Sequence, residues 1–455
     1  MKVAICASEV VPFAKTGGLA DVTGALPLVL EKLGVEAIVI MPRYKQAHNL
    51  ISGPYATIGK NVKVYFIEND AYFGRDWLYG DKSGDYKDNL ARFSYYCKKT
   101  LSLLKELDFH PDIIHCHDWQ SALIPVYLKT NLKEDNFYKK IKTVFTIHNL
   151  GYQGLFPKEE YPILGLEAKY FNPEALEFYG RINLLKAGIV FSDIISTVSP
   201  TYSKEIQGKQ FGFGLEGVLK LRAQQLFGIL NGIDYSIWDP QTDKIISSNY
   251  SASDLSGKEK DKQDLQKICN LPQEKGLPLF GIVSRLAEQK GFDLLEQGIE
   301  AICKMPLQLV ILGTGDQKYH RLLERAAKKY PNTLSLHLKF DDSLAHKIYA
   351  GCDVFLMPSK YEPCGLGQLI SLRYGTIPLV FKTGGLSDTV NHSNGFVFER
   401  YNKEDLLAKV KEALGAYSNK KLWSGLMKNA FSCDFSWESS AKEYLKLYEK
   451  AKSEP

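Results

Sequence analysis

Short runs of apolar and β-branched residues recur throughout the chain, and each run is followed by glycine or polar residues and then by a helix-like stretch. Such runs are typical of parallel strands that are buried on both faces of a sheet and alternate with helices. The pattern predicts an α/β fold with open, doubly wound sheets. The clearest predicted strands are Lys2–Ala7, Ala37–Met41, Asp112–His115, Thr143–Ile147, Ile194–Val198, Phe227–Leu230, Leu279–Val283, Leu307–Leu312, Val354–Met357 and Ile377–Phe381.

The chain is too long for one hydrophobic core. It has 455 residues, whereas a single core rarely grows beyond roughly 250–300 residues. Between residues 241 and 275 the alternation of strands and helices weakens, and serine, aspartate and lysine become frequent, as in a surface connection. We therefore predict a first domain over residues 1–240, a linker region over 241–275 and a second domain over 276–435. The amphipathic segment 436–455 is predicted to form a terminal helix that packs back on the first domain.

The charges of the chain are nearly balanced. Lysine and arginine number 57 against 52 aspartates and glutamates, and the net charge is +5. No block of like charge occurs, so the basic balance is weak evidence for nucleic acid, and we expect no nucleic-acid partner. A local group of cations that binds a phosphorylated ligand explains the excess at least as well.

The eight cysteines form no CxxC pair, and several lie in apolar runs. This favours reduced core thiols in a reducing compartment over a disulfide framework or a zinc site. The first residues resemble a core strand rather than a signal segment, and no uncharged run of about 18 residues occurs. We therefore expect a cytoplasmic protein with no membrane partner, and a plastid location only for a processed plant form.

Charged residues and glycines follow many of the predicted strands. Ligands of open α/β sheets bind outside the carboxyl ends of the strands, and ordinary loops do not concentrate such residues at one end of a sheet. The sequence therefore predicts a large polar active site between the two domains. The segments concerned are Lys15–Gly18, His115–Trp119, His148–Asn149, Asn231–Asp234, Ser284–Arg285, Gly313–Gly315, Glu362–Gly365 and Thr383–Gly385.

The sequence Lys-Thr-Gly-Gly-Leu occurs twice, at residues 15–19 and 382–386. Each copy follows a predicted strand and begins a predicted helix. Chance can produce five identical residues, but we interpret the repeat as two similar glycine-rich helix N-termini, one in each domain, directed toward one cleft.

Two cations and a glycine pair are candidates for phosphate binding. Arg285 and Lys290 follow a strand closely enough to clamp a diphosphate, Arg285 in a forked manner and Lys290 as a point charge. The alternative is a solvated loop. Backbone N–H groups of Thr383–Gly385 can approach phosphates at a helix N-terminus, although a simple turn is the alternative. Neither GxxxxGK[ST] nor GxGxxG is present at these places, which argues against a P-loop ATPase and a nicotinamide-binding fold.

Three histidines and one glutamate follow strands without an obvious structural purpose. His148 is either a structural hydrogen-bonding residue, as a lone histidine after a strand usually is, or a group that contacts substrate, and its place in the predicted cleft favours the second. His115 and His117 alternate in a strand and face the same side, as in a metal pair, but no further ligands occur at suitable spacing, so we predict no metal site. Glu362 is held by a rigid Pro-Cys-Gly turn and can bind sugar hydroxyls or a developing positive charge.

Taken together, these segments resemble the family of bacterial glycogen synthases and plant starch synthases. The similar motifs run in order along nearly the whole chain, and their combination is specific although no single motif is. The resemblance implies two Rossmann-like domains facing across a deep cleft, the GT-B glycosyltransferase architecture. It also implies retaining transfer of glucose from ADP-glucose to the non-reducing end of an α-1,4-glucan such as glycogen, starch or a maltooligosaccharide, without a cofactor or a metal. The motifs are Ser8–Val22, His117–Gln120, Thr146–Asn149, Thr197–Tyr202, Leu230–Asp234, Ser284–Leu286 and Glu362–Leu366.

The resemblance also implies roles for individual residues. Arg285 and Lys290 would neutralise the diphosphate leaving group, His148 would contact the transferred glucose, and Glu362 would lie beside the same sugar. One departure is Ile370, which stands where many related transferases carry a second glutamate, so the ribose contact is unassigned. Donor contacts in the first domain would come from Lys15, Gly17 and Gly18, the nucleotide-sugar pocket from Asn231, Cys364, Gly365, Leu366, Thr383, Gly384 and Gly385, and acceptor contacts, a weaker assignment, from Glu9, Asp118 and Tyr152.

No residue of the sequence stands out as a covalent nucleophile. We therefore expect a same-face reaction in which the leaving phosphate accepts the proton of the acceptor. Two alternatives stay open: a related retaining transferase that uses UDP-glucose or a non-glucan acceptor, and an inactive glucan-binding protein. Intact Lys15, His148, Arg285, Lys290 and Glu362 argue against the second, because a binding module needs no clamp for a leaving group.

Overall fold

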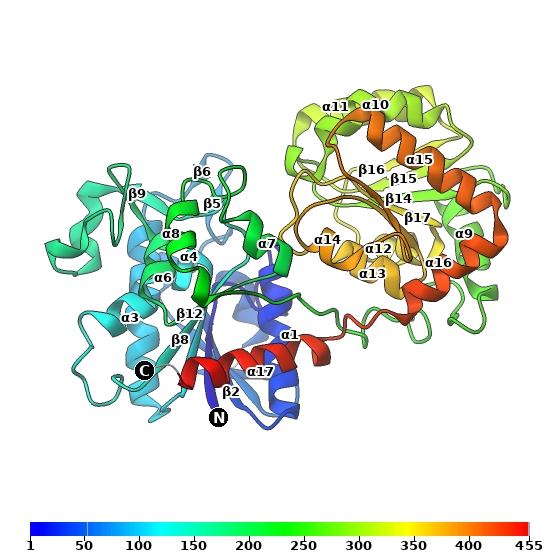
Figure 1. Ribbon diagram of the computed structural model, residues 1–455. Helices are drawn as coiled ribbons and strands as arrows, with labels where there is room; N and C mark the ends of the chain where they lie inside the picture. The colour runs from blue at the N-terminus through cyan, green and yellow to red at the C-terminus, as the bar shows by residue number, and fades with distance from the viewer. Residues whose placement is uncertain (52, 454–455) are drawn as a thin grey trace. The chain divides into compact units, whose positions relative to one another are not determined.

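The computed structural model describes residues 1–51 and 53–453, which form two compact units. The first unit comprises Met1–Gly232 and the chain from Trp437 onward, and the second comprises Ile233–Ser436. Figure 1 shows the strands and helices of each unit. Within the described ranges no helix is both long and apolar enough to cross a membrane.

The first unit is built on a sheet with the strand order β13-β12-β8-β7-β1-β2-β4-β3. All neighbours pair in parallel except the edge strand β3, which runs antiparallel to β4. The strands are β1 (Lys2–Cys6), β2 (Glu36–Pro42), β3 (Tyr55–Ile58), β4 (Val62–Ile67), β7 (Ile113–His117), β8 (Lys142–Ile147), β12 (Ile194–Thr197) and β13 (Leu226–Gly228). Shorter strands form a hairpin, β5 (Gly80–Asp81) and β6 (Gly84–Asp85), and a small sheet, β9 (Leu155–Pro157), β10 (Glu177–Phe178) and β11 (Arg181–Asn183).

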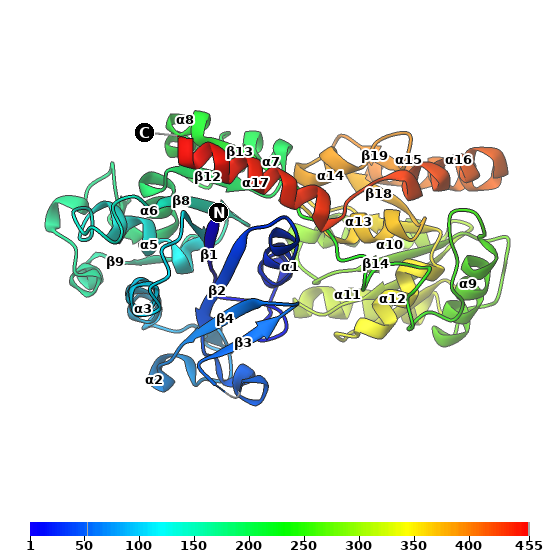
Figure 2. The same ribbon diagram turned by 90° about the horizontal axis from the view of Figure 1, so that it is seen from below.

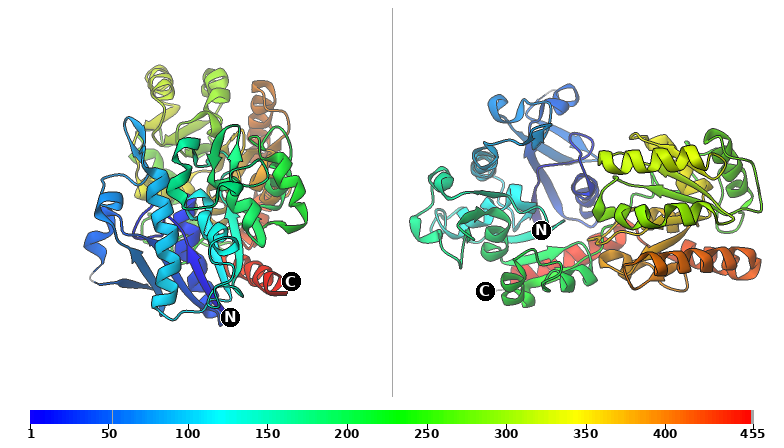
Figure 3. Two further views of the ribbon diagram at one scale, coloured as in Figure 1. Left: turned by 90° about the vertical axis from the view of Figure 1, so that its left-hand side faces the viewer. Right: turned by 90° about the horizontal axis from the view of Figure 1, so that it is seen from above.

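Helices cover both faces of this sheet, as a doubly wound fold requires. Helices α1 and α17 contact one another and the strands from one face, and α3 contacts β2 and β4 from the other (Figure 2). The buried side of α17, which includes Trp437, Tyr444 and Tyr448, belongs to the core of the first unit, where Figure 3 shows the helix in red. The helices are α1 (Gly18–Lys32), α2 (Asp70–Phe73), α3 (Asn89–Glu106), α4 (Asp118–Ser121), α5 (Leu123–Lys129), α6 (Leu184–Phe191), α7 (Pro200–Glu205), α8 (Glu216–Leu221) and α17 (Trp437–Ser453), with 3₁₀ turns at Lys45–Leu50, Lys158–Leu164, Ala168–Tyr170 and Ala223–Gln225.

The second unit has a wholly parallel sheet with the order β16-β15-β14-β17-β18-β19. Successive residues of β15 face two different cores: Leu309 and Ile311 pack with α10, α11, α15 and α16, whereas Val310 and Leu312 pack with α9, α12 and α13. The strands are β14 (Leu279–Val283), β15 (Gln308–Leu312), β16 (Leu334–His337), β17 (Val354–Met357), β18 (Ile377–Phe381) and β19 (Phe396–Phe398). The helices are α9 (Ser256–Ile268), α10 (Phe292–Cys303), α11 (Gln317–Lys329), α12 (Asp342–Gly351), α13 (Gly367–Arg373), α14 (Gly384–Thr389), α15 (Lys403–Ser418) and α16 (Lys420–Ser432), with a 3₁₀ turn at Glu288–Lys290.

The predicted α/β class is confirmed, and each predicted strand is present with its ends shifted by no more than two residues. The structure differs from the prediction at the domain boundary. The chain passes to the second unit at Ile233 rather than after residue 240. Trp238 stacks on His346, with ring centroids 3.9 Å apart, and Asp239 pairs with Arg373 at 2.5 Å, so this segment is fixed to helices of the second unit.

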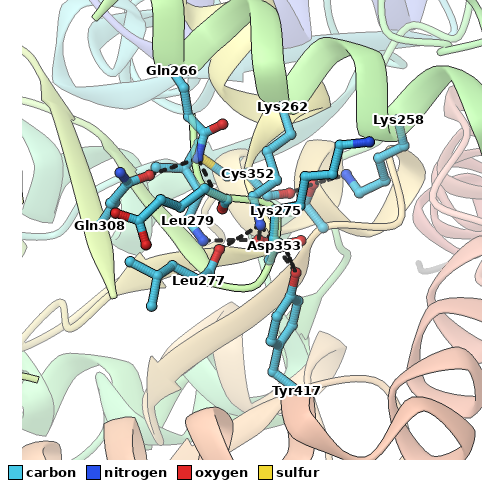
Figure 4. A network of polar contacts seen from close by, with 12 residues as sticks. Lys258, Lys262, Gln266, Lys275, Leu277, Leu279, Gln308, Cys352, Asp353 and Tyr417 are labelled. Carbon is cyan, nitrogen blue, oxygen red and sulfur yellow. Dashed lines mark hydrogen bonds and ion pairs between the residues drawn. The ribbon is translucent and has the colours of Figure 1, made fainter. Parts of the chain in front are cut away.

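The segment 241–275, predicted as a linker, also belongs to the second unit and contains α9. Its lysines made it resemble a surface connection, but two of them are buried. Lys258 Nζ donates to the carbonyls of Ala350 and Tyr374, at the C-termini of α12 and α13, and Lys262 Nζ pairs with Asp353 at 2.7 Å (Figure 4). Because buried ammonium groups need such partners, the charges of α9 are part of the fold.

Candidate active site

In the first unit, the loop after β1 is organised by the buried carboxylate of Glu9. It accepts hydrogen bonds from the backbone N–H and the hydroxyl of Thr16, from the N–H of Gly17 and from the hydroxyl of Tyr79. Both oxygens of Glu9 are therefore occupied by the loop that carries Lys15. Contact of Glu9 with an acceptor stays a prediction, and the observed role of this residue is to shape the loop.

This loop leads into an exposed helix N-terminus. Gly17 is the N-cap of α1 and Gly18 its first residue, and both are exposed. The ammonium group of Lys15 pairs with Asp21 in the first turn of α1 at 2.7 Å, and the Lys15 side chain is half exposed. Unpaired N–H groups at a helix N-terminus attract anions, so this end of α1 suits a negatively charged ligand group.

Asp118 and His148 lie together at the carboxyl ends of β7 and β8. The Asp118 carboxylate accepts a hydrogen bond from the backbone N–H of His148 at 2.8 Å. Asp118 has a φ of 54°, a conformation that few residue types other than glycine and asparagine adopt readily. Burial raises the pKa of Asp118 to about 7, and Glu9 adds to this shift. Glu9, Asp118 and His148, three of the predicted site residues, thus interact as one cluster in the first unit.

Three histidines form a ladder beneath this cluster. Nδ1 of His117 lies 2.9 Å from Nε2 of His148, and the rings of His117 and His115 stack with centroids 4.1 Å apart. His115 Nδ1 bonds to the Tyr448 hydroxyl of α17, and its Nε2 bonds to Thr146. The prediction that His115 and His117 face the same side is confirmed. Within the described ranges, no three His, Cys, Asp or Glu side chains are placed to hold a metal ion.

Burial keeps the rings of this ladder neutral. It lowers the pKa of His148 to about 3 and that of His115 to about 3, and it lowers the pKa of His117 well below the usual range. A neutral imidazole has one N–H donor and one acceptor nitrogen. His148 therefore offers hydrogen bonding rather than charge, which suits the hydroxyl groups of a sugar.

The first unit also contains a cavity of about 610 Å³, which is lined by residues that follow Asp118 and His148 in the chain, such as Trp119 and Gly151, and not by the histidines themselves. Its wall combines aromatic side chains with charged groups, and Tyr152, which is 55% exposed, lies on it. Carbohydrate sites use aromatic surface together with a few polar groups. Representative lining residues are Asp85, Tyr86, Trp119, Tyr152, Phe156 and Arg181.

In the second unit, the centre of the site is a nearly buried ion pair. Lys290 Nζ lies 2.6 Å from Glu362 Oε2, and the two side chains are 17% and 7% exposed. The Ser359 hydroxyl donates to the same oxygen at 3.0 Å. Lys290 ends the 3₁₀ turn after β14, and Glu362 follows β17, so neighbouring parallel strands bring the pair together across 72 residues.

Arg285 belongs to the same strand end but has a different environment. Its guanidinium is exposed, and no partner for it exists among the described residues. An arginine without a partner retains all of its hydrogen-bond donors for an external anion. Arg285 is thus a cation without a partner among the described residues, whereas Lys290 is paired with Glu362.

The second copy of the repeated pentapeptide differs from the first. Thr383, Gly384 and Gly385 are buried, and the N–H of Gly385 donates to the carbonyl of Glu362 at 3.0 Å. A Cβ on Gly384 would lie 2.0 Å from the Glu362 carbonyl oxygen, so glycine is required for close packing. Phosphate contact by these residues stays a prediction. Both copies begin a helix, as predicted, but the two helix N-termini differ: α1 begins with an exposed loop, whereas α14 is short and begins against the turn at Glu362.

The other predicted pocket residues are divided between the units. Cys364, Gly365 and Leu366 form the turn after Glu362, which Gln368 holds by donating to the carbonyls of Cys364 and Gly365. Asn231 belongs to the first unit, is buried, and has a side-chain oxygen that accepts no hydrogen bond among the described residues.

Sequence reasoning missed several supporting residues. Tyr79 carries no motif because its contact with Glu9 joins segments 70 residues apart, whereas Ser359 and Gln368 contact Glu362 and Cys364 from three and four residues away. From the sequence, His117 is a possible metal ligand and part of a family motif, and its contact with His148 is not predicted. Two features of the sequence could have indicated this contact: His117 alternates with His115 in one strand, and His148 follows the end of the next strand.

Two Rossmann-like units with polar groups at the carboxyl ends of their parallel strands fit a two-domain glycosyltransferase, and the family models assign the chain to that class. A family model described as starch synthase catalytic domain matches residues 2–221, and one described as glycosyl transferases group 1 matches residues 264–424. A glycogen synthase from Geotalea uraniireducens is 48% identical to this chain, and the match covers 98% of this chain and 98% of that protein. One from Thermosipho melanesiensis is also 48% identical, over 100% of this chain and 99% of its own.

The chain belongs to the glycogen synthase family. A solved structure supports the same assignment: the catalytic domain of starch synthase IV from Arabidopsis thaliana, bound to ADP and acarbose, superposes with a TM-score of 0.89 at 33% sequence identity. That match covers 100% of this chain and 99% of the other. The family resemblance drawn from the motifs and the GT-B class are therefore confirmed.

Proposed function

We propose that this glycosyltransferase moves glucose from ADP-glucose to the non-reducing end of an α-1,4-glucan, with retention at the anomeric carbon and without a metal or cofactor. The observation that carries the proposal is the group formed by the Lys290–Glu362 pair and the free Arg285 at one strand end of the second unit. The related starch synthase structure, which contains ADP and acarbose, supports the same donor nucleotide and acceptor class.

The cations account for departure of the nucleotide. Cleavage of the glycosyl–phosphate bond leaves negative charge on the diphosphate, and fixed positive charges lower the energy of that state. Arg285 would bind the diphosphate directly, while Lys290 is held in place by Glu362. The carboxylate of Glu362 then also lies where a sugar hydroxyl or an oxocarbenium-like charge is stabilised.

The first unit supplies groups for the transferred sugar, the donor and the acceptor. His148 would donate to a hydroxyl of the transferred glucose, and the exposed N-terminus of α1 with Lys15 would contact the donor. The cavity that Tyr152 lines would hold the glucan acceptor, since its aromatic wall suits the apolar faces of glucose units.

The proton of the acceptor hydroxyl passes to the leaving phosphate on the same face of the sugar, so that no covalent glucosyl-enzyme forms. Mass spectrometry of the enzyme quenched during turnover tests this step. A glucosyl adduct on Glu362 or Asp118 would overturn it and replace it with a double displacement.

The overall proposal is tested by measuring glucose incorporation into glycogen by the purified protein, with ADP-glucose and UDP-glucose in parallel and a chelator present. Preferential transfer from ADP-glucose supports donor, acceptor and metal independence together. Transfer only from UDP-glucose would assign another donor, and glucan binding without transfer from either would favour a binding protein. We also propose a cytoplasmic location, which the eight free thiols, seven of them buried, support.

A further inference from the structure

His117 is a fully buried histidine, and among the described residues its side chain has one hydrogen-bond partner, His148. Its Nδ1 lies 2.9 Å from His148 Nε2, and its Nε2 is buried without a hydrogen-bond partner among the described residues. The neighbouring His115 gives it none, since both ring nitrogens of His115 are engaged by Tyr448 and Thr146.

The unpartnered nitrogen determines the direction of the hydrogen bond. If His148 donated to Nδ1 of His117, the proton of neutral His117 would lie on Nε2 and would be a buried N–H without an acceptor. If His117 donates from Nδ1, its Nε2 is only an unused lone pair. Buried orphan N–H groups are rarer than under-satisfied acceptors. The arrangement therefore favours donation from His117 to His148.

The same bond fixes the proton of His148. When Nε2 of His148 accepts, its own proton must lie on Nδ1. Nδ1 of His148 has no partner among the described residues, and the His148 side chain is partly exposed, so this N–H is available to a ligand. The backbone of His148 is meanwhile held by Asp118.

We propose that His117 is a positioning residue that holds His148 in the Nδ1–H tautomer, so that His148 presents a hydrogen-bond donor to a sugar hydroxyl. The tautomer assignment rests on the structure alone, and its effect on transfer rests on the proposed function. The alternative is that His117 is only a core residue, in which case its substitution changes stability but not the protonation pattern of His148.

The test is ¹⁵N NMR of the intact protein with labelled histidine, because the shifts of the two ring nitrogens report the tautomer. Nine histidines are present, and a His148→Gln variant assigns the His148 signals. We expect His148 to be protonated on Nδ1 in the unsubstituted protein at pH 7.5. Protonation of His148 on Nε2 would overturn the proposal. This measurement needs no other variant and does not depend on enzymatic activity.

Two substitutions then separate positioning from packing. His117→Leu removes the donor and is expected to shift His148 toward the Nε2–H tautomer and to lower kcat about tenfold, the worth of one hydrogen bond of roughly 1.4 kcal/mol. His117→Asn places an amide N–H near the position of Nδ1, so it should retain the tautomer and recover activity to within about threefold. His115→Asn is the matched control on the same strand, and it should leave the His148 tautomer unchanged.

An unchanged His148 tautomer in His117→Leu would contradict the proposal, and so would a changed tautomer with unchanged kcat. If His117→Leu does not fold, the tautomer of the unsubstituted protein and of His117→Asn still decides the outcome. If transfer is absent from the unsubstituted protein, the proposed function fails while the NMR result stands.

Discussion

The two units supply site residues of opposite character. The carboxyl ends of β7 and β8 in the first unit carry hydrogen-bonding groups that burial makes less charged: a histidine ladder with strongly lowered pKa values and an aspartate whose pKa burial raises to about 7. The strand end of the second unit carries full charges, with Lys290 paired to Glu362 and Arg285 free. Burial disfavours the charged forms of the histidines and Asp118 at the first of these places, and pairing maintains the charges at the second.

The difference follows from the physics of burial. An isolated buried charge is costly, so the group becomes neutral unless a partner of opposite charge is present. The first unit provides no such partner for His148, whereas Glu362 and Lys290 provide one for each other. Neutral donors suit hydroxyl groups, and fixed charges suit a diphosphate, which is the division of labour that transfer from a nucleotide sugar needs.

The largest expected effect comes from removing the free cation. Arg285→Ala should lower turnover by about 10²–10³-fold because a stabiliser of the leaving group is lost. The free energy of unfolding should change by less than about 0.5 kcal/mol, since the side chain is exposed and unpaired. Steady-state kinetics and urea unfolding measure both quantities, and Lys329→Ala, which breaks the exposed pair with Glu300, is the control. A loss of turnover below about threefold would mean that Arg285 does not contact the diphosphate.

Lys290→Met should lower turnover to a similar extent but should also destabilise the second unit by about 3 kcal/mol, because it leaves Glu362 buried without its counter-charge. The double variant Lys290→Met/Glu362→Gln should recover most of the stability and none of the turnover. Urea unfolding of the single and double variants measures this difference. Equal stability of the single variant and the unsubstituted protein would show that the pair is solvated in solution.

Asp118→Asn tests whether burial raises the pKa of Asp118 in the folded protein. The pKa of Asp118 is raised to about 7 in the folded protein, so between about pH 4 and 7 the unfolded chain has lost this proton while the folded protein retains it. Asp118 therefore lowers the free energy of unfolding as pH rises through that window. Asparagine has no such titration, and it tolerates the positive φ of this position. Relative to the unsubstituted protein, the variant should gain about 1–2 kcal/mol between pH 5 and pH 8, less than the full shift because the side chain is partly exposed.

Urea unfolding at the two pH values provides the comparison for this variant. Asp112→Asn is a control of opposite sign: burial acts to raise the pKa of Asp112, but hydrogen bonds from Lys452 and from the Lys2 backbone outweigh it and lower the pKa. An equal pH dependence of the Asp118→Asn variant and the unsubstituted protein would show that Asp118 is ionised normally.

The smallest expected effect is on the acceptor. Tyr152→Ala should raise the KM for a maltooligosaccharide about fivefold, the equivalent of roughly 1 kcal/mol of lost contact, and leave the KM for ADP-glucose unchanged. Tyr55→Ala is the matched control, since Tyr55 is 41% exposed but does not line the cavity. A shift in the donor KM alone would place Tyr152 on the donor side.

Much of the fold was predictable because buried parallel strands are continuous apolar runs. Among the strands of the two main sheets, β3, β4, β16 and β19 were missed: β4 and β16 mix polar and apolar residues, and β3 and β19 are only four and three residues long. Helix α9 was missed for the opposite reason: its buried lysines are indistinguishable from surface lysines until Asp353 and the carbonyls that they contact are known.

The sequence by itself determined which residue types lie at the strand ends, and from them the family and the chemistry of a nucleotide sugar. Only the tertiary structure decided which of those side chains meet. The parallel register that sets His117 of β7 beside Thr146 of β8 brings His148 within reach of His117, and the order of strands in the second sheet brings Lys290 to Glu362. Charge states depend on such contacts, because the free energy of a charge is set by its partners and its burial rather than by its neighbours in the chain.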